Sequence, residues 1–182
     1  FAVITGCLQI AKESIFTGLN NFKVRTVSDI RFAEYFGFTD AEVKELLDYY
    51  DLEDKLECMK EWYDGYRFGN TYVYCPWDVL NQCDKFCESR NAGMESHWEN
   101  SSSNSIVKDI LEGSDKTTRA EIEALISGEY VEKPLISGLT YSDLDSGELQ
   151  KRQKYLWSVL FATGYLTDAG EPAGKVHRLV IP

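Results

Sequence analysis

Residues 61–80 read EWYDGYRFGNTYVYCPWDVL and contain seven aromatic side chains together with three turn signals. These signals are Asp64-Gly65, Gly69-Asn70 and Pro76. On both sides of Gly69-Asn70 aromatic residues alternate with other residues, which is typical of a small antiparallel hairpin. We therefore predict a hairpin over residues 66–74, followed by a helix that begins at Pro76, where a missing backbone N–H costs no hydrogen bond.

The aromatic rings of this segment either bind a partner or pack the hairpin. Stacking on nucleic acid usually comes with local positive charge, and Arg67 stands nearly alone as a cation here. Alternating rings between turn glycines suit a packed hairpin better than an open platform. We expect the rings to pack the hairpin between the preceding helices and the helix that starts at Pro76.

Two amphipathic helices are predicted before the hairpin. Thr39 and Glu42 form a capping box, and the apolar residues that follow at helical spacing are Val43, Leu46, Leu47 and Tyr50. A second helix is expected from about Leu52, with Leu56, Met59 and Tyr63 on one face. Residues 40–61 contain nine acidic residues against three lysines, so we expect this helical pair to present an acidic face to water.

A further helix and an edge strand are predicted from residue 118 onward. Thr118 and Glu121 form a second capping-box pattern, and Gly128 ends the helix that they begin. Residues 130–136 are expected to be extended at the edge of a sheet, because Pro134 cannot donate a ladder hydrogen bond.

The last third of the sequence predicts a winged-helix-like unit over residues 149–181. A helix runs through residues 156–163 and ends at Gly164. Residues 165–167 and 176–181 then read as two strands joined by a polar loop.

Winged helices often bind DNA, and basic residues flank this unit. The candidate nucleic-acid contacts are Lys151, Arg152, Lys154, Lys175 and Arg178, with His177 among them as a further flanking residue. A recognition helix needs basic and amide side chains, whereas WSVLFATG at 157–164 offers only Ser158 and Thr163 as polar groups. The formal net charge of −11 also opposes nonspecific binding to phosphate backbones. DNA contact is therefore the less favoured alternative.

The five cysteines favour a reducing cytoplasm over a disulfide framework, because their number is odd and the chain is long enough to bury a core. The spacing of Cys83, Cys87 and His97 resembles part of a metal-binding motif. The two cysteines lie one helical turn apart beside Val79, however, and no second chelating pair is present, so we interpret them as core residues and assign no metal ligands.

Length and composition favour a soluble cytoplasmic protein with a real core. No apolar run is long enough to span a bilayer. The chain begins FAVITGCLQI, without an initiator Met or the pattern of a signal peptide, so we expect it to be part of a longer protein. It contains none of the common phosphate-loop, dinucleotide or zinc-protease motifs, and we assign no catalytic residues.

Six segments spread along the chain point to a known family. They are ITGCLQIAKESIFTGLNNF (4–22), YFGFTDAEV (35–43), EWYDGYRFG (61–69), VYCPWDVLN (73–81), LTYSDL (139–144) and LWSVLFATGYLT (156–167). Through them the sequence resembles the AAA-ATPase-like family of bacterial proteins, in which a P-loop ATPase domain is commonly followed by a restriction-endonuclease-like nuclease domain. The resemblance covers nearly the whole chain but only the second half of that ATPase domain.

The resemblance implies an α+β fold that is mainly helical with small β elements. Residues 1–34 would form the end of the ATPase core, with the last strand of its P-loop sheet at residues 1–6. Residues 35–128 would form a helical lid subdomain, and residues 129–182 the winged-helix-like unit. The implied function is a regulatory or interaction module that relays nucleotide state to an attached effector domain. The alternative is an autonomous protein- or DNA-binding module.

ATP and Mg²⁺ are implied as ligands of the longer protein, with the missing P-loop core and a nuclease-like domain as partners in the same chain. By the same resemblance Thr5 sits where such ATPases sense the γ-phosphate, or it only caps the following turn. Lys12 reaches either a phosphate or a neighbouring carboxylate. Because the motifs that carry phosphoryl transfer precede residue 1, we expect this chain alone to bind no cofactor and to hydrolyse no ATP.

Overall fold

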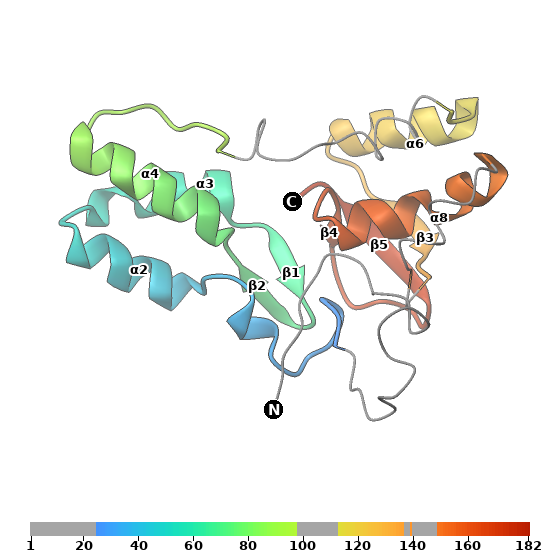
Figure 1. The fold of residues 1–182 in the computed structure, drawn as a ribbon, viewed down its shortest axis with the longest axis horizontal. Coiled ribbons are helices and arrows are strands. Elements are labelled where there is room, and N and C mark those ends of the chain that lie inside the picture. Colours follow the sequence, from blue (N-terminus) through green and yellow to red (C-terminus); the bar gives the residue numbers. More distant parts are fainter. Residues whose placement is uncertain (1–24, 98–112, 137–138, 140–148) are drawn as a thin grey trace, which may run out of the picture. The chain divides into compact units, whose positions relative to one another are not determined.

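The computed structural model describes residues 25–97, 113–136, 139 and 149–182, and the fold is α+β (Figure 1). Contacts divide the chain into two units. We call residues 26–103 with Pro182 the helical unit, and residues 1–25 with 104–181 the sheet unit. Each unit is described by itself. No helix among the described residues is long and apolar enough to cross a membrane.

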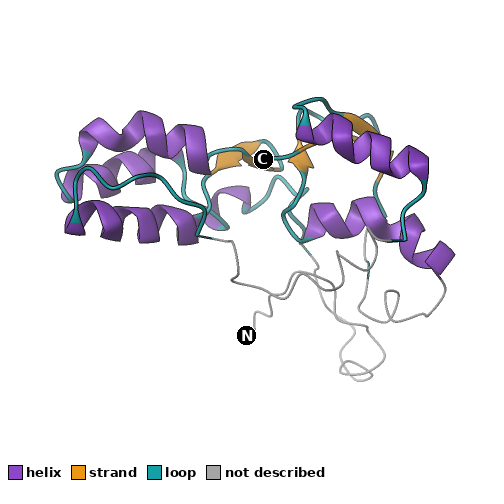
Figure 2. Cartoon of the chain, turned by 90° about the horizontal axis from the view of Figure 1, so that it is seen from above, coloured by secondary structure: helices purple, strands orange, loops and turns teal. Residues whose placement is uncertain are grey.

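The helical unit contains four α-helical or 3-10 segments before a hairpin and one long helix after it (Figures 1 and 2). The elements are η1 (Ala33–Tyr35), α2 (Asp40–Tyr49), η2 (Glu53–Lys55), α3 (Leu56–Tyr63), β1 (Tyr66–Phe68), β2 (Thr71–Val73) and α4 (Pro76–Glu88). The predicted capping box at the start of α2 is confirmed, since Thr39 N donates to the Glu42 carboxylate at 2.8 Å and the Thr39 hydroxyl accepts from Glu42 N.

The core of the helical unit lies where α2, α3 and α4 pack together. Its buried side chains are Val43, Leu47, Leu52, Met59, Tyr63, Tyr74, Val79, Cys83 and Phe86. The predicted helical stripes therefore do face the core, apart from Tyr50, which follows the last residue of α2 and stays 43% exposed. Full burial of an aliphatic or aromatic side chain contributes about 1.5–3 kcal/mol, so this cluster dominates the stability of the unit.

The predicted hairpin is confirmed: β1 and β2 pair antiparallel, with Tyr66 opposite Val73 and Phe68 opposite Thr71. Gly69 turns the chain with φ +52°, and a Cβ there would lie 2.7 Å from the carbonyl oxygen of Asp29, so the position requires glycine. Pro76 is the first residue of α4, as predicted.

The rings of residues 61–80 range from buried to exposed, with Tyr66 and Phe68 in between, so the packing expectation is correct only in part. Tyr63 and Tyr74 are buried in the core of the helical unit. In contrast, Trp62, Tyr72 and Trp77 are 51%, 55% and 56% exposed. This contrast leaves aromatic surface available for binding around the hairpin.

The described part of the sheet unit contains two helices and a three-stranded antiparallel sheet. Its elements are α6 (Lys116–Ile126), β3 (Val131–Pro134), α8 (Leu149–Ala162), β4 (Thr167–Asp168) and β5 (Val176–Val180). The strand order is β3-β5-β4, so Pro134 lies in an edge strand as predicted. The main core cluster consists of Leu125, Val131, Leu156, Trp157, Leu160, Leu166 and Leu179.

Two sequence-based boundaries in the sheet unit are wrong. Asp115, rather than Thr118, caps α6: its carboxylate accepts from Thr118 N at 2.7 Å, so the helix begins two residues before Thr118. The strand expected at residues 165–167 begins only at Thr167. The reason is that the backbone N–H groups of residues 165 and 166 both donate to the carbonyl of Leu160, which holds them in the turn that ends α8.

Some predictions concern residues outside the described part of the chain. The P-loop strand at residues 1–6 is one of them. The predicted domain boundaries, with breaks after residues 34 and 128, stay predictions. In the structure α6 contacts β3 and belongs to the sheet unit.

Candidate functional site

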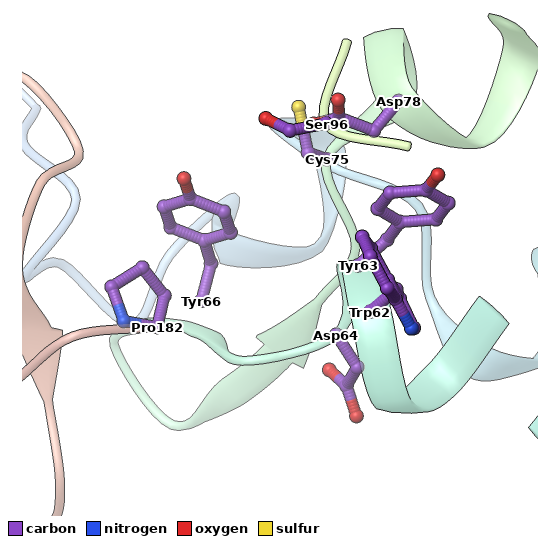
Figure 3. A pocket seen from close by; sticks show the side chains of 8 residues that line it. All are labelled: Trp62, Tyr63, Asp64, Tyr66, Cys75, Asp78, Ser96 and Pro182. Atoms are coloured by element: carbon purple, nitrogen blue, oxygen red, sulfur yellow. The ribbon is translucent and has the colours of Figure 1, made fainter. Parts of the chain in front are cut away.

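A hollow of about 160 Å³ lies beside the hairpin of the helical unit (Figure 3). Its lining residues are Trp62, Tyr63, Asp64, Tyr66, Cys75, Asp78, Ser96 and Pro182, the last of which is grouped with this unit by its contacts. We call it the aromatic hollow. Figure 3 shows the ring of Tyr66 on one side, and the rings of Trp62 and Tyr63 on the other.

The aromatic hollow forms where α3 ends and the chain turns into β1. Asp64 leaves the helix in an extended conformation, and its carboxylate accepts from the N–H of Gly65 at 2.8 Å. Gly65 has φ +141°, a conformation that side chains rarely allow. These two residues separate the rings of Trp62 and Tyr63, at the end of the helix, from the ring of Tyr66, at the start of the strand.

Asp78 supplies the buried charge of the aromatic hollow. It lies in the first turn of α4, where a helix dipole favours an anion, and it is only 7% exposed. Its Oδ1 accepts a hydrogen bond from His97 N at 3.1 Å. Within the described residues the other carboxylate oxygen has no hydrogen-bond partner.

A buried amide holds the loop beside the hollow in place. Gln82 is fully buried, and its Nε2 donates to Gly93 O at 3.1 Å. Its Oε1 lies 3.0 Å from both the Tyr63 hydroxyl and His97 Nε2. The Tyr63 hydroxyl also lies 2.6 Å from Glu95 O, so one network links α3, α4 and residues 93–97.

The phenols that line the aromatic hollow are neutral at physiological pH. Burial raises the pKa of Tyr63 to about 12, and the Asp78 carboxylate adds to the effect. Burial likewise raises the pKa of Tyr66 to about 12, with further contributions from Cys75 and Asp78. The hollow therefore presents neutral phenol rings beside the carboxyl groups of Asp64 and Asp78.

Sequence reasoning missed Asp78 and Gln82 as site residues, although a usable signal exists. The two residues are four positions apart in a predicted helix and share the face that carries Val79, Cys83 and Phe86. Polar residues on an apolar helical face indicate a buried polar network. His97 is 15 residues from Gln82, so no local pattern identifies it as the third member.

The candidate nucleic-acid residues have different surroundings. Lys154 and Lys175 are exposed, and Lys154 Nζ lies 6.0 Å from the Tyr155 ring centroid. Arg178 is engaged, because its Nε donates to Glu132 at 3.0 Å and its guanidinium lies 5.2 Å from the Tyr130 ring centroid. Lys151 and Arg152 lie in α8, and their side chains are outside the described part of the structure. Thr5 and Lys12 also lie outside the described residues.

His177 is buried, which corrects its grouping with the basic flank. It is 9% exposed, and its Nδ1 lies 2.9 and 3.0 Å from the two carboxylate oxygens of Asp168. Asp168 is itself 5% exposed, and the Phe161 ring lies 5.7 Å from the imidazole. This pair ties β4 to β5 and does not present a cation to a ligand.

Cys83, Cys87 and His97 do not belong to one metal-binding group. Cys83 is buried, and burial raises the pKa of its thiol to about 11, whereas Cys87 is exposed. The His97 ring contacts Gln82 instead. Over the described ranges, no group of three His, Cys, Asp or Glu side chains is placed to hold a metal ion.

A comparison with curated proteins finds a distant relative. An uncharacterized protein in the vnfD 5′ region of Azotobacter chroococcum mcd 1 is 25% identical over 183 residues, an alignment that covers 98% of this chain. The chain spans about 30% of the length of that curated relative. No family model matches the sequence, and no solved structure matches the fold.

Proposed function

We propose that this chain is the helical lid and winged-helix-like portion of a bacterial AAA-ATPase-like protein. There it relays the nucleotide state of a P-loop core to an attached effector domain, which in the family it resembles is commonly a nuclease. The observation that carries the proposal is the order of elements in the sheet unit. Among the described residues α6, β3, α8 and the β4–β5 hairpin come in this order along the chain, and β3 pairs with β5. This order supports the proposal, because a winged helix also places a helix directly before a terminal β-hairpin.

The interactions of the sheet unit favour a regulatory or protein-contacting role over DNA binding. Ser158 is buried and accepts from Ile136 N at 2.9 Å, and the Thr163 hydroxyl donates to Val159 O at 2.7 Å. Both polar groups of residues 157–164 are thus used within the unit, whereas the cations of α8 lie in its N-terminal half, at Lys151, Arg152 and Lys154. Arg178 is likewise paired with Glu132, so fewer cations remain for phosphates.

The alternative is an autonomous protein- or DNA-binding module without nucleotide dependence. The exposed cations Lys154 and Lys175 favour it. A cytoplasmic location is part of both proposals. ATP and Mg²⁺ enter the first proposal through the family resemblance alone.

The two proposals differ in whether ATP binding to the longer protein changes the sheet unit. We expect this chain to bind no ATP, whereas a longer protein that includes the upstream region should bind it and change the hydrogen exchange of the sheet unit on doing so. Two results would support the alternative. The 182-residue chain would bind DNA with an affinity that falls steeply as the salt concentration rises, and ATP would not change the DNA affinity of the longer protein.

Thr5 provides a sharper test in the longer protein. If its hydroxyl senses the γ-phosphate, Thr5→Ala should leave ATP affinity nearly unchanged and slow turnover by roughly tenfold to hundredfold, because the lost hydrogen bond strengthens in the transition state. Lys12→Ala should weaken ATP binding if the amine contacts phosphate. Wild-type turnover in the Thr5→Ala protein would leave Thr5 as a turn cap.

A further inference from the structure

The aromatic hollow combines three features that suit a cation. Its walls include the rings of Trp62 and Tyr66, and aromatic faces attract cations through their quadrupoles. Asp64 and Asp78 add two carboxylates to the lining. The lining contains no Lys or Arg that would neutralise these charges.

Asp78 indicates where the charge of a ligand would be matched. Asp78 is only 7% exposed, and it lies on the lining of the hollow. A buried carboxylate is costly unless it is fully hydrogen-bonded or paired with a cation. Oδ1 is satisfied by His97 N, while the second oxygen is without a protein partner in the described part of the chain.

The geometry points to a binding site for the guanidinium group of an arginine side chain, held between the rings of Trp62 and Tyr66 and paired with Asp78. This site would operate whether or not the chain belongs to a nucleotide switch. A guanidinium fits these groups better than an ammonium does, because it is planar, stacks on aromatic faces and is weakly hydrated.

The arginine is expected to belong to a peptide segment rather than to be the free amino acid. Free arginine carries an α-ammonium and an α-carboxylate, and the lining offers no Lys or Arg to pair with that carboxylate, so its desolvation would oppose binding. An arginine within a peptide lacks that negative charge. The preferred partner is therefore an arginine-containing segment of a protein.

The test is a titration of the whole chain with Nα-acetyl-arginine amide, in which two-dimensional NMR spectra are recorded at each ligand concentration. We expect saturable shifts at the Trp62 indole N–H and weaker binding of free L-arginine. Nα-acetyl-citrulline amide, which has the same shape without the charge, should cause no saturable shift. No saturable shift with the arginine amide, or equal shifts with the citrulline amide, would overturn the proposal. Equal or tighter binding of free arginine would overturn the assignment to a peptide.

Two substitutions test the residues themselves. Asp78→Asn keeps the shape and should weaken the affinity for arginine amide about tenfold or more, because it removes a charged hydrogen-bond acceptor. Asp84→Asn is the matched control, since Asp84 is exposed on the same helix and outside the lining, and it should leave the affinity unchanged. Equal losses in both variants would indicate a general charge effect and contradict the site.

Trp62→Ala tests the site independently if the Asp78→Asn chain does not fold. Trp62 is half exposed, so its replacement should leave the fold intact. It should weaken binding by roughly threefold, the size expected for an exposed cation–π contact. Tyr72→Ala is the control, since Tyr72 is similarly exposed and does not line the hollow. Wild-type affinity in the Trp62→Ala chain would exclude the aromatic hollow as the binding site.

Discussion

Individual side chains make the helical unit sensitive to alkaline pH. Burial raises the pKa of Tyr63 and Tyr66 to about 12, above the value near 10 of an unfolded tyrosine. The folded state therefore holds its phenol protons more tightly than the unfolded state. The stability that this contributes is complete below pH 10 or so and is lost as the pH rises through the folded pKa.

Tyr66→Phe tests this proton linkage with little structural change, since the variant lacks only the hydroxyl. We expect the urea midpoint of the wild-type chain to fall between pH 9 and pH 11, and the fall to be smaller in the variant. Both measurements need a reducing agent, because thiols also ionise in this range. Parallel pH profiles would show that Tyr66 does not titrate on unfolding.

His177→Ala should be the most damaging single change in the β4–β5 hairpin. It leaves the carboxylate of Asp168 buried without its ring partner, which costs about 3 kcal/mol. Arg178→Ala, at the next residue, removes an exposed ion pair and should cost under about 1 kcal/mol. Urea unfolding followed at Trp157 measures both. Similar costs for the two variants would contradict a structural role for the buried pair.

Within single elements, local signals account for much of the fold. Thr39 and Glu42, three residues apart, determine the capping box of α2, and the single residue Pro76 marks the start of α4. The cap of α6 was misassigned because Asp115 and Thr118 are both good N-caps, and only tertiary packing selects between them. The start of β4 depends on two backbone N–H groups that remain bonded to α8.

The α2 capping box should give that helix an acid-sensitive N-terminus. Hydrogen bonds from the backbone and hydroxyl of Thr39 lower the pKa of Glu42. A lowered pKa contributes stability above the unfolded value, which is lost as the pH falls through the folded one. Thr39→Ala should cost about 1 kcal/mol at pH 7 and progressively less at lower pH, as the carboxylate of Glu42 takes up a proton and stops accepting these hydrogen bonds. Thermal unfolding over a series of pH values measures this difference.

Glu45→Gln serves as the control for Glu42→Gln, because Glu45 lies on the same helix and is also exposed. Only the substitution at residue 42 should flatten the acid dependence of the unfolding temperature. If both substitutions change it equally, the effect reflects the overall acidity of α2 rather than the cap.

On the scale of the whole molecule, the candidate site was much less predictable than the fold class. The sequence indicated that the aromatic residues around Gly69-Asn70 form a hairpin. The alternation of aromatic and other residues did not indicate which of these rings are exposed. Asp78 and His97 meet across 19 residues, and that contact depends on how the chain after α4 returns to its N-terminal turn. Such long-range pairs leave no periodic signal in one sequence.

The two units have separate cores, which predicts that damage to one leaves the other intact. Met59 and Leu179 are both fully buried, one in each core. Either residue changed to Ala should destabilise its own unit by about 2–5 kcal/mol, through lost apolar burial and the cavity left behind. Hydrogen exchange read by mass spectrometry should show faster exchange over residues 40–88 for Met59→Ala and over residues 154–180 for Leu179→Ala. Equal loss of protection in both regions from either change would mean that the chain unfolds as one cooperative body, because independent cores cannot transmit the full cost of a cavity to each other.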